Sequence, residues 1–172
     1  LNKLTTAQVA ALTTGEVQAL TSTQVAALAT AQAQALTTGQ LVALGGQVAA
    51  LGSDALLALS DAQLTAFTSA QVGAFTTTQL NAMESTDLQA LSTAQIRSMT
   101  TAQVAGLSTD QIRVLTGTQV AALSVTQVKA LQSEQLNALP SSTLRAMTAQ
   151  QISALQSDQV GSLTTQQLAT LS

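Results

Sequence analysis

The sequence predicts an all-α fold, an elongated solenoid of short capped helices with one helix in each eight-residue repeat. Large apolar residues return every eight positions along almost the whole chain, and each unit opens with a pattern typical of a helix N-terminus. The charged residues are placed as a helix in every unit would require. A chain of short, similar units is typical of a solenoid, in which each unit packs only against its neighbours.

The period is visible when the 172-residue chain is divided before each recurring large apolar residue, as in LTTAQVAA, LTTGEVQA and LTSTQVAA. We call that first residue the anchor and each unit an octad. The anchors are Leu4, Leu12, Leu20, Leu28, Leu36, Leu44, Leu51, Leu59, Phe67, Phe75, Met83, Leu91, Met99, Leu107, Leu115, Leu123, Leu131, Leu139, Met147, Leu155, Leu163 and Leu171. The frame breaks once, because Leu44 and Leu51 are seven residues apart. The sequence therefore predicts a single array over residues 1–172, expected to be a fragment of a longer array or filament, with a phase slip at residues 45–50.

Neither a continuous α-helix nor a β-strand accounts for a period of eight. Eight residues at about 100° each advance an α-helix by about 800°, so successive octads would be rotated by about 80° and no face would stay apolar. In a strand, the adjacent small residue and anchor would point to opposite faces. One short helix per octad satisfies the pattern.

Each octad carries the polar residues of a helix cap just after its anchor. The Thr5 side chain can accept from the backbone N–H of Gln8, and the Gln8 side chain can reach back to the N–H of Thr5, which is a capping box. Leu4 and Val9 occupy the two positions of a hydrophobic staple. The expected capping residues are Thr5, Gln8, Thr21, Gln24, Thr68, Gln71, Thr100 and Gln103. As a lost cap interaction, replacing Gln103 by Ala is expected to cost about 1 kcal/mol.

In four octads the Ser or Thr of the first polar position is replaced by Glu, Gln or Pro. There Glu84, Gln132, Pro140 or Gln156 is followed by Ser. Because Ser is a favourable N-cap, we expect the helix start to move forward by one residue in these octads. Pro140 then precedes its helix and breaks no internal hydrogen bond.

The charged residues support a helix in every octad. All eight acidic residues fall one to four positions after an anchor, whereas Arg97, Arg113, Lys129 and Arg145 each fall six positions after one. Acids at the N-terminus and bases at the C-terminus are the arrangement that the helix dipole favours. Each octad is therefore expected to start its helix near the acids and end it near the bases.

Residue spacing also bears on how many octads make one coil of the solenoid. The four basic residues just named are 16 residues apart, which favours two octads per coil. Asp110, Glu134 and Asp158 are instead 24 residues apart, so three octads per coil is the alternative.

Stability must come from packing between octads, because an isolated helix shorter than about 12 to 15 residues is marginal in water. Each octad offers an anchor, a medium apolar residue five positions later, and a small residue, usually Ala, before the next anchor. These predict a continuous Leu/Val/Ala core. Its expected members include Leu12, Val17, Leu20, Val25, Leu28, Leu91, Ile96, Met99, Val104, Leu107, Ile112, Leu115, Val120 and Leu123.

Composition excludes most reactive chemistry. The chain has no His, Cys, Trp or Tyr, and carboxylate pairs such as Asp54 with Asp61 or Glu84 with Asp87 stand where helix starts favour acids. We therefore expect no enzyme activity, no cofactor and no metal site. A net charge of −3 is the wrong sign for binding a phosphate backbone, so nucleic acid is not an expected partner. No apolar run approaches the roughly 20 residues of a membrane-spanning helix.

The surface left after the core is removed is rich in Thr, Ser, Gln, Ala, Asn and Gly, and charged residues are only 8% of the chain. Low charge weakens repulsion between molecules, which favours self-association into a homo-oligomer or filament. Gln stands four positions after most anchors, and we call these residues the Gln column. They are interpreted as helix caps, with a ladder that binds a partner as the alternative. The Thr and Ser residues that follow the anchors are also interpreted as caps, with attachment of O-linked sugars or an ice-facing array as the alternatives.

Two resemblances bear on function. The LTTAQVAALTT pattern of residues 4–14 is similar to octapeptide arrays in very large bacterial secreted or surface proteins grouped with repeat-containing adhesins. That resemblance implies an extracellular or cell-surface location, with the cell envelope or glycans as further partners, but it transfers no functional residue. The LTSTQV segment of residues 20–25 resembles the opening of transcription-activator-like effector repeats. The period of roughly 34 residues, the base-reading loop and the basic surface of those repeats are missing, so DNA binding is not implied.

The expected function is therefore that of a structural repeat protein, which forms an extracellular stalk, filament or surface layer by repeat stacking and self-association. The alternative is a recognition or adhesion module that binds a peptide, a glycan or a surface along an exposed face of the solenoid.

Overall fold

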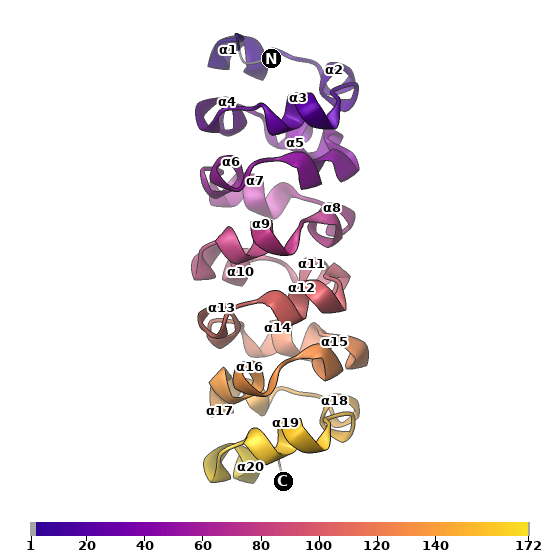
Figure 1. The fold of residues 1–172 in the computed structure, drawn as a ribbon, viewed down its shortest axis with the longest axis vertical. Coiled ribbons are helices and arrows are strands. Elements are labelled where there is room, and N and C mark those ends of the chain that lie inside the picture. Colours follow the sequence, from indigo (N-terminus) through magenta and orange to yellow (C-terminus); the bar gives the residue numbers. More distant parts are fainter. Residues whose placement is uncertain (1–2, 172) are drawn as a thin grey trace.

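The computed structural model describes residues 3–171, which form a column of short helices stacked along one long axis (Figure 1). The two ends of the chain lie at opposite ends of this column. The elements are α1 (Thr6–Ala10), α2 (Thr14–Gln18), α3 (Ser22–Ala26), α4 (Thr30–Gln34), α5 (Thr38–Ala43), the 3-10 helix η1 (Gly45–Ala50), α6 (Ser53–Leu57), α7 (Asp61–Ala66), α8 (Ser69–Ala74), α9 (Thr77–Ala82), α10 (Ser85–Ala90), α11 (Thr93–Ser98), α12 (Thr101–Gly106), α13 (Thr109–Arg113), α14 (Gly117–Ala122), α15 (Val125–Ala130), α16 (Ser133–Ala138), α17 (Ser141–Leu144), α18 (Ala149–Ser153), α19 (Ser157–Ser162) and α20 (Thr165–Leu171). The predicted all-α solenoid, with one short helix per octad, is confirmed.

The backbone of one octad explains why the chain coils. In the octad of α12, six helical residues are followed by Leu107 (φ −64°, ψ 143°) and Ser108 (φ −70°, ψ 160°), which are both extended, before α13 begins. Two extended residues between short helices redirect the chain at each anchor. Because the same turn is repeated in successive octads, the helices wind into a regular coil.

A coil contains between three and four octads. Helix α12 packs against α9 and α15, the third helices before and after it, and the same spacing relates α8 to α11 and α13 to α16. The preferred prediction of two octads per coil is wrong, and the alternative of three is closer. The prediction failed because Arg97, Arg113, Lys129 and Arg145 are exposed, so no packing contact constrains their spacing.

The core consists of the anchor and medium apolar columns, which join into one continuous cluster through the stack. Of the core residues expected from the sequence, those buried are Val17, Leu20, Val25, Leu28, Leu91, Ile96, Met99, Val104, Leu107, Ile112, Leu115, Val120 and Leu123. Leu12 is only half-buried, because it lies in the first coil of the described residues. Phe67 and Phe75 replace Leu at adjacent anchors and pack edge to face, with ring centroids 5.2 Å apart.

The predicted third core column is only partly buried, although Ala74 packs against the core. The Ala residues before the anchors are half-buried, as at Ala74 and Ala82, or exposed, as at Ala11 and Ala19. The third buried column is formed instead by Gln side chains, such as Gln103 and its equivalents. A polar column can be buried at low cost only when its hydrogen-bonding groups are satisfied.

The helices of octads without a Ser or Thr cap do not move forward by one residue as expected. Helix α16 begins at Ser133 with Gln132 as its N-cap, and the backbone N–H of Gln132 donates to Oε1 of Gln135 at 2.7 Å. Gln135 therefore holds the usual register even though the N-cap side chain makes no hydrogen bond. The same N-cap register is kept at Glu84, Pro140 and Gln156.

The phase slip at residues 45–50 coincides with a change of helix type. Helix α5 passes through Leu44 directly into η1, and Gly45 takes a φ of +54°, a left-handed conformation that glycine adopts without steric cost. One residue fewer in this octad removes the position that would cap the helix. As a result, Gln47 Oε1 is buried without a hydrogen-bond partner.

Glycine at position 73 allows two coils to approach closely, and this generates a prediction. A Cβ built on Gly73 in α8 would lie 2.8 Å from the backbone oxygen of Ser98 in α11, whereas a Cβ on Gly161 in α19 meets nothing within 4 Å. We expect Gly73→Ala to lower the free energy of unfolding by about 1 to 3 kcal/mol through overpacking. Gly161→Ala, the matched control, should be neutral or stabilising by up to about 1 kcal/mol because Ala favours helix. Urea titrations followed by circular dichroism measure both variants, and equal midpoints would contradict the close approach of α8 and α11.

Candidate functional site: the buried glutamine column

The feature that most distinguishes this solenoid is a column of buried Gln side chains, one from nearly every interior octad. Gln103 shows the geometry. Its Oε1 accepts from the backbone N–H of Thr100 at 2.6 Å, and its own backbone N–H donates to Oγ1 of Thr100 at 3.1 Å. Its Nε2 donates to the backbone oxygens of Val72 at 3.1 Å, Gly73 at 3.3 Å and Phe75 at 2.6 Å. The Gln103 side chain therefore joins the start of α12 to the end of α8, the fourth helix before it.

The same arrangement recurs along the array with an almost constant sequence separation. Nε2 of Gln127 donates to the backbone oxygens of Ile96 at 3.1 Å and Met99 at 2.7 Å, which are 31 and 28 residues earlier. Other Gln residues that bond to the oxygen of an anchor in the preceding coil are Gln32, Gln40, Gln63, Gln79, Gln95, Gln111, Gln119, Gln135, Gln151, Gln159 and Gln167. We call this bond from one coil to the coil before it the amide clamp.

The amide clamp satisfies backbone groups that a short helix leaves free. An α-helix has unpaired N–H groups at its start and unpaired C=O groups at its end, and a helix of five or six residues consists mostly of such ends. A carboxamide offers one acceptor oxygen and two N–H donors, so it can satisfy both ends at once. Each net hydrogen bond contributes about 0.5 to 1.5 kcal/mol. The two N–H donors of the Gln103 carboxamide, shared among three carbonyl oxygens, therefore add about 1 to 3 kcal/mol to its cap interaction.

The cost of about 1 kcal/mol that the sequence predicts for replacing Gln103 by Ala includes only the cap interaction. A signal for the second role was present in the sequence, because a capping box accepts Glu as readily as Gln and the helix dipole favours an acid at this position. Yet Glu occupies the column only at Glu16. Glu16 is exposed, and its carboxylate accepts from the N–H of Thr13 at 2.8 Å. A Glu in a buried position would have no N–H to offer the carbonyls of the preceding coil.

The four capping pairs expected from the sequence occupy the positions that it predicted, in two environments. Thr5, Thr21, Thr68 and Thr100 are N-caps, and their side chains accept from the backbone N–H groups of Gln8, Gln24, Gln71 and Gln103. The side chains of Gln71 and Gln103 are buried and form amide clamps, whereas those of Gln8 and Gln24 are exposed. The difference arises because Gln8 and Gln24 lie in the first coil of the described residues.

Two interior octads carry another polar residue in the column. Asp87 still accepts from the backbone N–H of Glu84 at 3.0 Å, but it is too short and has no N–H with which to reach the preceding coil. Burial raises the pKa of the Asp87 carboxyl, with further contributions from the charges of Glu84 and Asp61, although the bond from the Glu84 N–H opposes the shift. Thr143 follows Pro140, which has no N–H to be capped, and is buried without an amide clamp.

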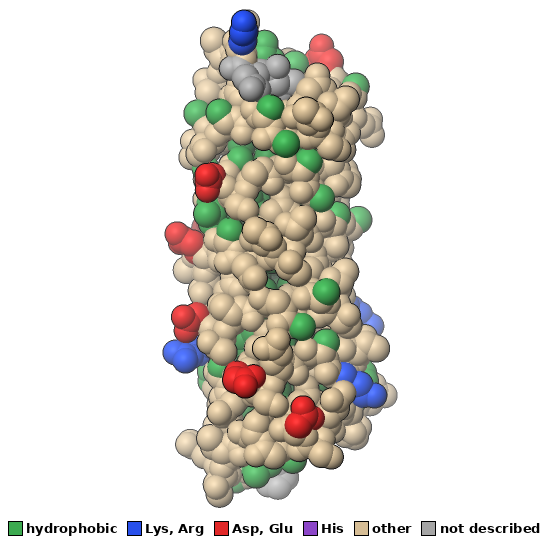
Figure 2. All heavy atoms as spheres, viewed as in Figure 1, with side chains coloured by type: hydrophobic (Ala, Val, Ile, Leu, Met, Phe, Trp, Pro, Cys, Tyr) green, Lys and Arg blue, Asp and Glu red, His purple; other side chains and the backbone are tan. Residues whose placement is uncertain are grey.

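The rest of the surface carries few chemically distinctive groups. Figure 2 shows scattered charged side chains and small separate hydrophobic ones on a predominantly uncharged polar face. The carboxyl of Asp110 lies 3.9 Å from the guanidinium of Arg113, and both side chains are exposed. Of the carboxylate pairs noted in the sequence, Asp54 and Asp61 are exposed at the first turns of α6 and α7. Within the described residues, no cluster of three or more acidic side chains could hold a metal ion.

Fold and site together define a helical repeat protein, a solenoid of octads linked by amide clamps. A family model described as the ALTTAQ repeat matches residues 80–117 and 128–165, and this chain is similar to that repeat in both segments. A search of curated proteins finds no match for the chain. None of the helices in residues 3–171 is both long enough and apolar enough to cross a membrane.

The role of the amide clamp predicts unequal effects for the same substitution at two positions. Gln103→Glu keeps the cap acceptor but places a carboxylate against the oxygens of Val72 and Phe75, and we expect a loss of about 2 to 4 kcal/mol in the free energy of unfolding. Gln24→Glu at an exposed cap reproduces the environment of Glu16 and should change stability by less than about 0.5 kcal/mol. Urea denaturation at pH 7 measures both variants. Similar losses at the two positions would show that the clamp contributes little beyond the cap.

The raised pKa of Asp87 predicts a pH-dependent difference in stability between the wild type and variants at this position. Because its pKa is raised in the folded state, the charged form is disfavoured there, so wild-type stability from this group falls as pH rises from its ordinary pKa through the folded value. Asp87→Asn removes the charge, so its advantage over wild type should be absent at low pH and appear above this range. Asp87→Gln is one methylene longer than Asp87→Asn, so its N–H donors can reach the Leu59 carbonyl, 28 residues earlier, and it should be more stable than Asp87→Asn by about 1 to 2 kcal/mol at pH 7. Thermal unfolding between pH 3 and pH 7 checks this order. A difference in melting temperature between wild type and Asp87→Asn that stays constant across this pH range would contradict the charge effect.

Proposed function

We propose that this chain is a structural module of an extracellular or cell-surface stalk, filament or layer, and that its coils associate with further coils through the amide clamp. Such a coil belongs either to the same chain or to another copy, because the contact is the same in either case. The observation that carries the proposal is the uniformity of this contact: the bonds of Gln103, Gln127 and Gln151 to the preceding coil have the same partners in the repeat and nearly the same lengths.

The faces at the two ends of the described column are of the two kinds that pack against each other inside it. At one end, Gln8 and Gln24 are exposed although their equivalents in later coils are buried clamps. At the other end, Ile152 and Leu155 are only half-buried, and no amide clamp from a described residue reaches the Leu155 carbonyl. Inside the column, faces of these two kinds pack against each other at every coil. Joined between copies, they form a heterologous contact, which propagates when the rotation does not close.

The surface is consistent with assembly into extended structures. Low charge reduces repulsion between neighbouring copies. The match to the ALTTAQ repeat and the resemblance of the octads to bacterial surface arrays both support a structural rather than a catalytic role. An extracellular location rests on that resemblance alone, and labelling of intact cells with an antibody to the array would test it.

End-to-end association predicts oligomers whose formation depends on the end face. We expect the chain to form elongated oligomers or fibres with rising concentration, detected by sedimentation velocity and electron microscopy. Gln8→Lys combined with Gln24→Lys places charges on the end face and should reduce assembly at least tenfold. The matched control is Ala62→Lys combined with Ala102→Lys, on exposed sides of α7 and α12, which should assemble like the wild type.

Two results would count against this proposal. Equal assembly of the two double variants would show that association does not use the end face. A chain that remains monomeric at all concentrations and binds a glycan or peptide saturably would favour the alternative function, a recognition module that uses an exposed face of the solenoid.

A further inference from the structure

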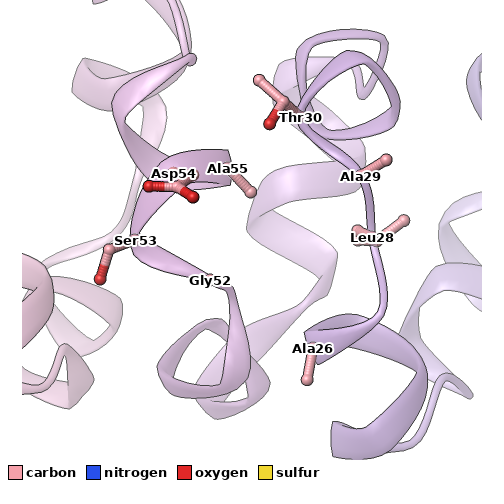
Figure 3. Close-up of a pocket in the computed structure, with 8 residues that line it drawn as sticks. All are labelled: Ala26, Leu28, Ala29, Thr30, Gly52, Ser53, Asp54 and Ala55. Atoms are coloured by element: carbon pink, nitrogen blue, oxygen red, sulfur yellow. The ribbon is translucent and has the colours of Figure 1, made fainter.

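A cavity of about 320 Å³ opens between the end of α3 and the start of α6. It is lined by Ala26, Leu28, Ala29, Thr30, Gly52, Ser53, Asp54 and Ala55 (Figure 3). The two lining segments are about one coil apart in sequence and face each other across the opening, with the Ala55 methyl group directed toward the gap. The cavity is therefore a gap between consecutive coils and not a hollow within one helix.

The cavity lies where the repeat loses its amide clamp. The octad of α6 has Gly52 at the N-cap and Ala55 in the Gln column. In the next octad, Nε2 of Gln63 donates to the oxygens of Leu36 at 2.7 Å and Gln34 at 3.1 Å, which are 27 and 29 residues earlier.

The same two separations from Ala55 lead to Leu28 and Ala26, which both line the cavity. The space is thus the one that a Gln side chain fills in the following octad. The wall contributed by α3 is the end of a helix, which carries backbone carbonyl groups. The cavity is therefore lined by these groups as well as by the N-terminus of α6.

The groups that a carboxamide would satisfy remain without partners. Among the residues that the structure describes, no hydrogen bond reaches the backbone oxygen of Leu28, and the backbone N–H of Gly52 donates to no acceptor. Gly52 has φ −61° and ψ 146°, close to the φ −72° and ψ 159° of Thr100. The Gly52 N–H is therefore oriented relative to its helix like the Thr100 N–H, which donates to Oε1 of Gln103. Ala55, 3% exposed, closes the floor with a methyl group.

We propose that this cavity binds a primary carboxamide, the head group of a Gln or Asn side chain presented by a peptide ligand. The ligand NH₂ group donates to the carbonyl oxygens of Leu28 and Ala26, and its oxygen accepts from the N–H of Gly52. This is the set of bonds that the chain's own Gln residues form in other octads. A guanidinium or ammonium group would find the exposed Asp54 at the rim but would leave the Gly52 N–H without an acceptor.

The test uses propionamide as the probe and the full 172-residue chain labelled with ¹⁵N. We expect saturable chemical-shift changes centred on the amides of Gly52, Ala55 and the residues around Leu28, with a dissociation constant on the order of 10 mM, as befits five heavy atoms. Propionate has the same shape but no N–H donor, and guanidinium has donors but no acceptor. Both should perturb these amides at least fivefold less at equal concentration.

Two variants separate a specific site from general solvent effects. Ala55→Gln restores the clamp residue and should fill the cavity from within, abolish the propionamide response and raise the melting temperature. Ala55→Leu fills the same volume without polar atoms and should also abolish the response. The proposal is overturned if wild type shows no localised shifts, if either filled variant responds like wild type, or if guanidinium or propionate binds as well as propionamide.

Discussion

In this solenoid the carboxamide of a buried Gln joins the start of one helix to the end of the fourth helix before it, and the rest of the architecture depends on that link. For Gln103, Oε1 accepts from the N–H of Thr100 while Nε2 donates to oxygens at the end of α8. A helix of six residues leaves most of its backbone groups unpaired at its two ends. Such a helix can be buried between coils only if something satisfies those groups. The amide clamp does so and at the same time sets the distance between coils.

Apolar packing supplies the complementary part of the stability. The anchors and the medium apolar residues of every octad meet in one core that continues from coil to coil, as Val104 and Leu107 illustrate. This burial is not directional, so it brings coils together without determining their register. The hydrogen bonds of the Gln column are directional, and they tie Gln127, for example, to carbonyls 28 and 31 positions earlier. Together the two columns make a coil that repeats without drift.

The irregular octads show what each part of the repeat contributes. Loss of one residue at the phase slip turns an α-helix into a 3-10 helix, places Gly45 at positive φ and leaves Gln47 Oε1 unpaired. Loss of the Gln side chain at Ala55 leaves the helix intact but opens a cavity between α3 and α6. A missing position therefore disturbs the local backbone, whereas a missing clamp disturbs only the contact between coils.

The sequence by itself determined one short helix in each octad, its start wherever Ser or Thr follows the anchor, and the two apolar columns, because these depend on neighbours within eight residues. Thr100 and Gln103 predict an N-cap, and Val104 and Leu107 predict a buried face, wherever the octad lies in space. The sequence did not determine the number of octads per coil, the half-buried state of Ala74 and its equivalents, or the second role of Gln. These depend on which octads meet after the chain has turned through a full coil, about 28 residues later. Only the tertiary structure decided them, because small rotations at each extended anchor accumulate, and no local pattern records where their sum brings the chain.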